Sequence, residues 1–179
     1  MHDILLPGNV QNMDYYKIHD VVHKSFLNPG ERRHFIFTAT TDDKIVVRGN
    51  FRENILNRFK YMKRTKIHKN NDIVSFYIRL RVTTSVNGKQ LPTLDEKLDD
   101  KIEEIFRDES DSNKGGGLIL YNFTTERKNI YVPVKKNIIP SVLIKGMGII
   151  VDEQKFNERF QYGFGGPRSF GHGMMMLTS

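Results

Sequence analysis

The sequence contains no cysteine, no tryptophan and no long apolar run. Without cysteine, a fold held by disulfides and a zinc site with thiolate ligands are both excluded. No apolar stretch approaches the length of about 20 residues that a helix needs to cross a bilayer. The first ten residues, MHDILLPGNV, lack the basic and apolar segments of a secretory signal peptide. Together these absences predict a cytoplasmic protein.

The charge is unbalanced in favour of basic residues. Lysine and arginine number 28 against 21 aspartate and glutamate residues, which gives a formal net charge of +7. A basic surface favours polyanionic partners such as nucleic acid, although many soluble proteins are basic without one. The length of 179 residues suits one medium domain or two small ones.

The first half of the chain predicts the element order of a ferredoxin-like unit. After a short strand, Ile18, Val22 and Phe26 fall at helical spacing and predict a helix with Asp14 in its first turn, ended by residues 28–30. A hairpin, a second amphipathic helix and a long strand follow, with expected ranges 34–40, 44–49, 51–62 and 72–86. The RNA-recognition module has the same order of strands and helices. The long strand does not alternate cleanly, so a bulge is expected in it.

Residues 87–92, NGKQLP, interrupt this pattern and are expected to link the two halves. An acidic helix is predicted at 93–109, with Leu94 on its apolar side, followed by a hairpin that turns at 126–129. The chain then ends in the order strand, helix, strand. The predicted fold class is therefore α+β, with two ferredoxin-like units in tandem over 1–86 and 87–179, the second of them degenerate.

A glycine-rich stretch, GFGGPRSFGHG at 163–173, precedes the last expected strand. Glycine loses more backbone freedom on folding than any other residue, so such a loop is costly to order. A dinucleotide-binding loop or P-loop is disfavoured, because the stretch follows a helix, opens a strand and lacks the G-K-[ST] tripeptide. Two interpretations remain. One is a connection made of tight turns, and the other is a cradle whose bare N–H groups approach RNA phosphates, with Arg168 as a charged donor.

This loop resembles the C-terminal glycine-rich loop of the CRISPR-associated RAMP endoribonucleases. The shared pattern is G-x-G-x-x-[basic]-x-x-G-x-G before an apolar strand, carried here by Gly163, Gly165, Arg168, Gly171 and Gly173. Within that superfamily the chain is most similar to the CasE type, the Cascade subunit that processes repeat RNA. The segments YYKIHDVVHKSF, HFIFTAT and VSFYIRLRVTTS resemble that type's first helix, the strand after it and its long basic strand.

Three titratable rings lie along one flank of the first helix, those of Tyr16, His19 and His23. Taken alone, they fit half-buried boundary residues as well as the lining of a cleft. A metal site on the two histidines is disfavoured, because no H-E-x-x-H pattern is present. The resemblance implies that His19 is catalytic, with Tyr16 one turn before it. It also implies that Arg168 stabilises charge on the reacting phosphate, and His23 is the reserve candidate.

Two basic patches are candidates for binding RNA. One is KYMKRTKIHK at 60–69, and the other is the pair Arg79 and Arg81, which share one face of the long strand. Basic side chains on a strand or loop can follow an RNA backbone, although an ordinary solvated loop also carries lysines. The acidic helix would repel RNA and is expected to lie away from it. The residues expected to contact RNA are Lys60, Lys63, Arg64, Lys66, Arg79, Arg81, Gly163, Gly165, Ser169 and Gly171.

The expected function is a metal-independent endoribonuclease that binds the stem-loop of CRISPR repeat RNA. It would cut on the 3′ side of the stem, leave a 2′,3′-cyclic phosphate and a 5′-hydroxyl, and keep the product. The expected partners are this RNA and other Cas subunits of a Cascade-type complex, with no cofactor and no membrane. Two other classes stay open. These are a non-catalytic RNA-binding module of the same fold, and a protein-interaction scaffold that would show no affinity for stem-loops above non-specific binding, with a weak salt dependence.

Overall fold

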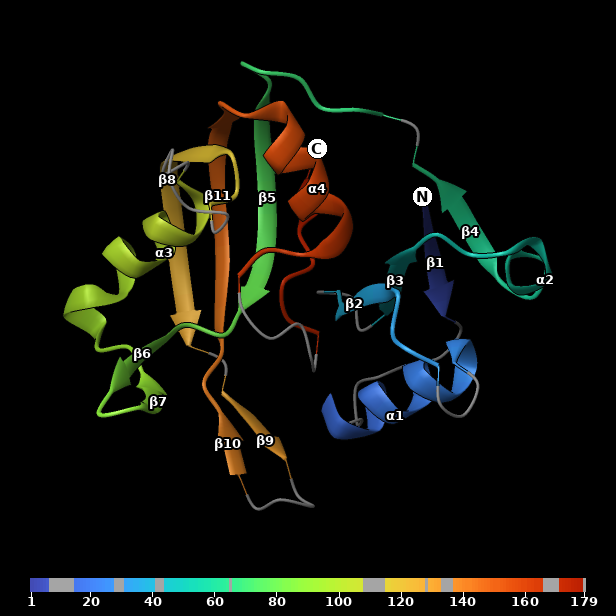
Figure 1. Cartoon of the computed structure of the whole chain (residues 1–179), viewed down its shortest axis with the longest axis horizontal. Helices are drawn as coiled ribbons and strands as arrows, with labels where there is room; N and C mark the ends of the chain where they lie inside the picture. Colours follow the sequence, from blue (N-terminus) through green and yellow to red (C-terminus); the bar gives the residue numbers. More distant parts are fainter. Residues whose placement is uncertain are drawn as a thin grey trace.

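Two four-stranded antiparallel sheets stand side by side in a computed structural model of the protein (Figure 1). The structure describes residues 1–6, 15–27, 31–40, 44–64, 66–107, 115–127, 129–132, 137–165 and 171–178. Each sheet has its own hydrophobic core, and a third, smaller cluster lies between them. Among the described residues, no helix is both long and apolar enough to span a bilayer.

The first sheet has the strand order of a ferredoxin-like unit. Its elements are β1 (His2–Leu6), α1 (Tyr15–Phe26), β2 (Phe35–Ala39), β3 (Ile45–Gly49), α2 (Glu53–Leu56) and β4 (Lys60–Lys63). The order β2-β3-β1-β4 puts β1 and β3 in the middle and leaves β2 and β4 at the edges. Helix α1 buries Ile18, Val22 and Phe26 as the helical spacing predicts, and the hairpin of β2 and β3 is also confirmed.

Two elements predicted for the first half are wrong. The second helix, expected over 51–62, ends at Leu56, because Lys60–Lys63 pairs with the edge of β1 and becomes a strand. The long strand, expected to complete the first sheet, is β5 (Ile73–Leu80) and pairs with two strands of the second sheet. Buried and more exposed positions alternate strictly along β5, so it has no bulge.

The second sheet repeats the topology of the first. Its strands are β5, β8 (Leu118–Arg127), β11 (Val142–Ile150) and β12 (Met176–Thr178), in the order β12-β5-β11-β8. Helices α3 (Leu98–Phe106) and α4 (Glu153–Tyr162) pack on one face, and a 3₁₀ turn (Asp95–Lys97) precedes α3. Two hairpins are added to this plan, β6 (Thr83–Val86) with β7 (Lys89–Pro92) and β9 (Ile130–Val132) with β10 (Asn137–Ile139). The α+β class with tandem ferredoxin-like units is confirmed.

Three details of the second half differ from the prediction. Asn87 and Gly88 have φ angles of 50° and 75° and form the two-residue turn between β6 and β7, so 87–92 is a hairpin. Strand β8 pairs with β11 and does not turn back on itself at 126–129. Leu94 is exposed. The division between residues 86 and 87 stays a prediction, because strand pairing does not delimit units that fold alone.

A buried arginine of the first unit, Arg48, is hydrogen-bonded to both units. The guanidinium of Arg48 is 0% exposed and donates to both carboxylate oxygens of Asp3, at 2.8 and 3.0 Å. Its Nη1 also donates to the backbone oxygens of Phe160 and Met175, at 3.0 and 2.9 Å. Arg64 reaches the same carboxylate through Nε at 2.9 Å. Since Phe160 and Met175 lie on opposite sides of the glycine loop in sequence, Arg48 fixes both approaches to that loop.

Substituting Gly117 with alanine is expected to destabilise the second unit. Gly117 has a φ of +67°, and a Cβ there would lie 2.4 Å from the backbone oxygen of Asp152. The left-handed conformation alone costs an L-residue roughly 1–2 kcal/mol, and overpacking adds about 1–3 kcal/mol more. Gly88→Ala is the matched control, because Gly88 has a φ of +75° with nothing within 4 Å. Urea unfolding should show a larger loss for Gly117→Ala, and equal losses would contradict the packing argument.

Candidate functional site

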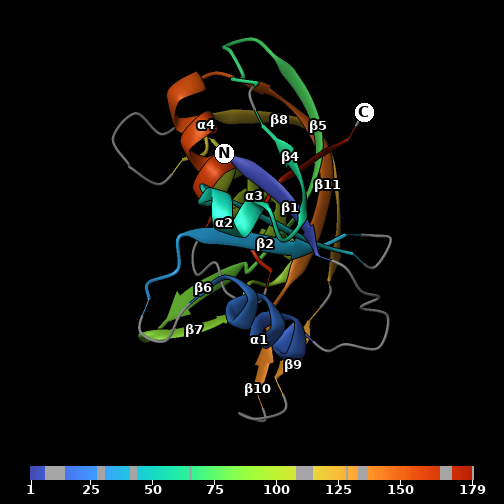
Figure 2. The same cartoon turned by 90° about the vertical axis from the view of Figure 1, so that its right-hand side faces the viewer.

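Edge strand β2 lies between helix α1 and the end of the glycine loop. Phe35 and Phe37 face α1 and belong to the core of the first unit. Ile36 points to the opposite face and packs with Met174, which follows the loop. Figure 2 shows β2 with α1 on one side and α4, the helix that leads into the loop, on the other. Residues far apart in sequence therefore meet at this strand.

Two histidines of α1 form a stacked pair over β2. The ring centroids of His19 and His23 are 4.0 Å apart with an interplanar angle of 24°. His19 also meets Phe37 edge-on at 6.2 Å, and His23 meets Phe35 edge-on at 5.9 Å. Both histidines are half-buried, as the flank position of the sequence analysis predicts. Tyr16, one turn before His19, is half-buried as well.

The surroundings favour the neutral form of both imidazoles. Burial, then the stacked His23, then the Arg33 guanidinium lower the pKa of His19 to about 4, against a smaller opposing effect of Asp20. Burial and Arg33 also lower the pKa of His23. Near neutral pH, His19 is therefore unprotonated and able to accept a proton.

Arg33 lies beside a narrow cleft between the two units. The cleft has a volume of about 100 Å³. One wall is formed by residues 33–36, and the other by Gln161 and Tyr162 at the end of α4. Arg33 therefore brings a permanent positive charge to the space between the histidine pair and the start of the glycine loop.

Removing the charge of Arg33 is expected to raise the pKa of His19. The guanidinium disfavours the imidazolium form, so Arg33→Gln should move the pKa of His19 upward from about 4 towards its usual value of 6.5. Arg32→Gln is the matched control, because Arg32 is the exposed neighbour in sequence. An NMR titration of the histidine ring protons measures the shift. Identical His19 pKa values in the two variants would contradict this electrostatic coupling.

Both described ends of the glycine loop are tied down by backbone hydrogen bonds. The N–H of Gly163 donates to Arg159 O at 2.6 Å and closes α4. The N–H of Phe164 donates to Gly173 O at 2.9 Å, and the N–H of Gly173 donates to Arg79 O at 2.8 Å. The ring of Phe164 is buried in the second core. The loop thus leaves and returns at one point beside β5.

Four glycines of the loop have backbone angles that disfavour other residues. Their φ angles are +101° at Gly163, +72° at Gly165, +78° at Gly171 and +83° at Gly173. Glycine adopts such angles without a steric penalty. The tight-turn interpretation therefore explains these four positions, and a phosphate cradle stays a prediction. Residues 166–170 lie outside the described part of the chain, and with them the candidates Arg168 and Ser169.

The structure separates the first basic patch from the histidine pair. Lys60 and Lys63 are exposed on β4, the edge strand opposite β2 (Figure 1). With β3 and β1 between them, the usual strand spacing puts β4 roughly 14 Å from β2 across the sheet. Arg64 forms an ion pair with Asp3, whereas Lys66 is exposed. His68, which interrupts the patch in sequence, is only 4% exposed and packs in the core. RNA contact by these basic residues stays a prediction, at a place away from α1.

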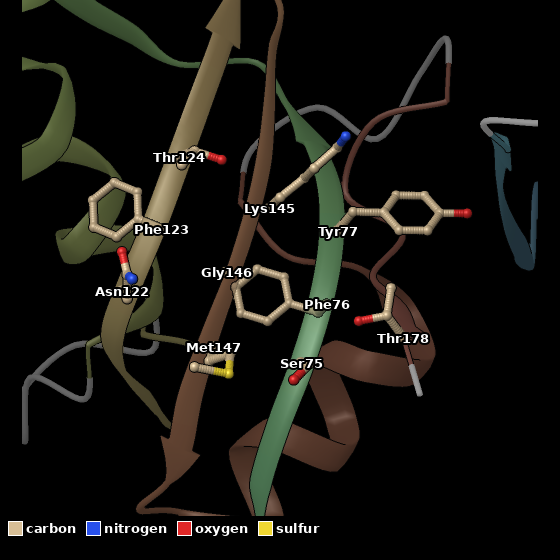
Figure 3. Close-up of a pocket in the computed structure, with 10 residues that line it drawn as sticks. All are labelled: Ser75, Phe76, Tyr77, Asn122, Phe123, Thr124, Lys145, Gly146, Met147 and Thr178. Atoms are coloured by element: carbon tan, nitrogen blue, oxygen red, sulfur yellow. The ribbon is translucent and has the colours of Figure 1, made fainter.

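The second basic pair borders the open face of the second sheet. Arg79 and Tyr77 share the face of β5 that the helices leave uncovered, and Arg81 lies just beyond the end of the strand, half-buried. A cavity of about 490 Å³ lies on this face, shown in Figure 3. Its lining residues are Ser75, Phe76, Tyr77, Asn122, Phe123, Thr124, Lys145, Gly146, Met147 and Thr178. No motif in the sequence predicts this cavity.

Several residues around β2 were not predicted from sequence. Arg33 lies in the run ERRH just before β2. Its positive charge was the one sequence feature that could have marked it as a candidate for binding RNA. Ser141 and His172 are also buried. His172 lies inside the glycine-rich stretch, but nothing in the sequence marked its side chain as buried. Within the described ranges, no group of three histidine, aspartate or glutamate side chains is arranged to hold a metal ion.

The chain is similar to solved structures over its whole length. No family model matches the sequence, and no curated protein matches it either. The CRISPR endoribonuclease Cse3, bound to a 19-nucleotide RNA, has a TM-score of 0.73 at 14% identity, covering 99% of this chain and 96% of that one. Cas6e of Escherichia coli, a CRISPR-associated protein, has a TM-score of 0.69 at 16% identity, covering 99% of each chain.

A third similar structure belongs to a larger assembly. A chain of E. coli Cascade, bound to a double-stranded DNA target, has a TM-score of 0.60 at 12% identity, again covering 99% of each chain. At these identities the likeness establishes a shared fold. The resemblance inferred from the glycine loop and the first helix is confirmed at that level.

Proposed function

We propose that this protein is a CRISPR endoribonuclease that binds the stem-loop of repeat RNA and cuts the precursor on the 3′ side of the stem. The observation that carries the proposal is the stacked pair His19 and His23, half-buried on α1 against one face of β2, whose other face packs with Met174 just after the glycine loop. The whole-chain similarity to an endoribonuclease bound to RNA supports it. The net charge of +7 suits a polyanionic substrate.

The proposed reaction uses the RNA's own 2′-hydroxyl as the nucleophile. His19 takes the proton from this hydroxyl as its oxygen attacks the adjacent phosphorus. The bond from phosphorus to the 5′-oxygen then breaks, this oxygen takes a proton from water, and His19 passes the proton it accepted to the hydroxide that is left. The products are a 2′,3′-cyclic phosphate and a 5′-hydroxyl, and no step needs a metal ion. His19, whose pKa is about 4, is unprotonated at neutral pH and can accept this proton, and its lowered pKa makes it a weaker base than an ordinary histidine.

Positive charge near the reacting phosphate would stabilise the more negative transition state. Arg33 supplies it from the described part of the site, and Arg168 is proposed to add to it from the loop. An arginine serves here as a fixed charge and hydrogen-bond donor, because its guanidinium does not give up a proton in proteins. His23 is assigned the role of stacking partner that helps keep His19 unprotonated.

The protein is further proposed to hold its product and to enter a Cascade-type complex in the cytoplasm. The similarity to a chain of E. coli Cascade supports this part of the proposal. A hairpin held after cleavage would connect the processed RNA to the other Cas subunits. The basic residues of β4 and β5 are the candidates for tracking the RNA backbone.

A panel of labelled CRISPR repeat hairpins, incubated with the purified protein in EDTA, tests the proposal. A single cut at the 3′ base of one hairpin, with cyclic phosphate ends, is the expected result. Tight and salt-dependent binding without a cut would favour the non-catalytic RNA-binding module. The absence of binding above that of an unrelated hairpin would favour the protein-interaction scaffold.

A further inference from the structure

A buried hydrogen bond joins the glycine loop to a hairpin of the second unit. His172 Nε2 and Ser141 Oγ are 3.1 Å apart. The two residues are 2% and 1% exposed, so this contact is shielded from water. A shielded hydrogen bond is stronger than one in solvent, and a partner left unpaired there is costly. The contact therefore constrains the last residues of the loop.

Ser141 stands at the base of the hairpin β9–β10. It lies between β10 and β11, directly before β11, and its N–H donates to Asn129 Oδ1 at 3.3 Å. Asn129 precedes β9, so this bond closes the base of the hairpin from both arms. Strand β9 in turn lies against helix α1, which carries His19. The path from the loop to the catalytic helix thus runs through His172, Ser141 and β9.

The loop has a second, independent attachment at β5. Gly173, next to His172, donates its N–H to Arg79 O at 2.8 Å. That backbone bond fixes the loop to the sheet and is indifferent to side-chain identity. The side chain of His172 also fixes the loop to the β9–β10 hairpin through its bond with Ser141, and this hairpin contacts α1.

We propose that His172 and Ser141 are positioning residues that set the glycine loop against the helix bearing His19. The proposal rests on the proposed nuclease function and assigns to it a pair of residues that do not touch the RNA. Losing the bond would leave RNA affinity nearly intact and slow the chemical step. Small misplacements of groups that act together reduce rates steeply, by about 10²-fold for 1 Å.

The test compares three variants in single-turnover cleavage at saturating protein, with RNA affinity measured in parallel. His172→Leu removes the bond, and His172→Gln places an amide near the position of Nε2. Thr93→Val is the control for losing a partly buried side-chain hydrogen bond elsewhere in the second unit, because Thr93 and Thr84 are joined at 3.0 Å near the β6–β7 hairpin. Thermal unfolding of all three reports general destabilisation.

The expected result is a cleavage rate at least about tenfold lower for His172→Leu, with most of the rate restored by His172→Gln. A fourth variant, Ser141→Ala, should match His172→Leu, and Thr93→Val should cleave like the unsubstituted protein. The proposal is overturned if His172→Leu cleaves at the normal rate, or if Thr93→Val slows cleavage as much at equal loss of stability. It is also overturned if Gln restores nothing. An unsubstituted protein that cuts no hairpin would instead refute the nuclease function.

Discussion

Replacing His19 with alanine is expected to lower the single-turnover cleavage rate of a repeat hairpin by about 10²–10⁴-fold, the usual contribution of a general base. The half-buried imidazole is neutral near pH 7, because its pKa is about 4, and alanine offers no group that accepts the 2′-proton. Affinity for the RNA should change by no more than about threefold, or about 0.7 kcal/mol. Cleavage and binding are measured on the same labelled hairpin.

Two other histidine variants make the test specific. His2→Ala removes an imidazole from β1, away from α1, and is expected to cleave normally. His23→Ala removes the stacked ring but keeps His19, and is expected to slow the reaction less than His19→Ala does. If His19→Ala cleaves as fast as the unsubstituted protein, His19 is not the base. If His23→Ala alone abolishes cleavage, the roles of the two histidines are exchanged.

Replacing Arg48 with methionine is expected to lower the free energy of unfolding by about 3–5 kcal/mol, the cost of removing one partner of a buried ion pair. The change removes four hydrogen bonds and leaves the carboxylate of Asp3 to Arg64 alone. It also frees the backbone oxygens of Phe160 and Met175, which flank the glycine loop. Urea unfolding followed by circular dichroism measures the loss.

Arg58→Met is the control for this variant, because Arg58 is exposed on the same unit, and its loss should stay within about 0.5 kcal/mol. The double variant Asp3→Asn with Arg48→Met should lose less than the sum of the single variants, since the two residues interact directly. A loss below about 1 kcal/mol for Arg48→Met would show that the pair does not hold the units together.

The sequence predicted an element correctly where its local hydrophobic pattern agrees with the way the element packs in the folded protein. The spacing of Ile18, Val22 and Phe26 predicted α1 and, with it, the flank on which His19 lies. Strand β5 was recognised but assigned to the wrong sheet, because a strand's pattern reports which face is buried and not which strand it pairs with. The same limit applies to β4, whose Lys60–Lys63 reads as part of a basic helix and loop until the edge of β1 is available.

Only some residues of the candidate site could be predicted from the sequence. The glycine loop was conspicuous, yet the positive φ angles of Gly163, Gly165, Gly171 and Gly173 supply a backbone reason for glycine that does not involve RNA. Arg33 and Ser141 belong to no motif and reach the site only through the packing of β2 and the β9–β10 hairpin. The buried Arg48 was unpredictable for a further reason, since its partners come from three distant segments.

In the proposed reaction, the 2′-hydroxyl of the RNA is the nucleophile and His19 activates it. The most direct test is a cognate hairpin with a single 2′-deoxyribose at the nucleotide before the scissile phosphate, compared with the all-ribose hairpin in EDTA. The account predicts equal binding of both, cleavage of the all-ribose hairpin to a 2′,3′-cyclic phosphate, and no cleavage of the deoxy-substituted one. Cleavage of the substituted hairpin at the same phosphate, or a 5′-phosphate on the product, would contradict it.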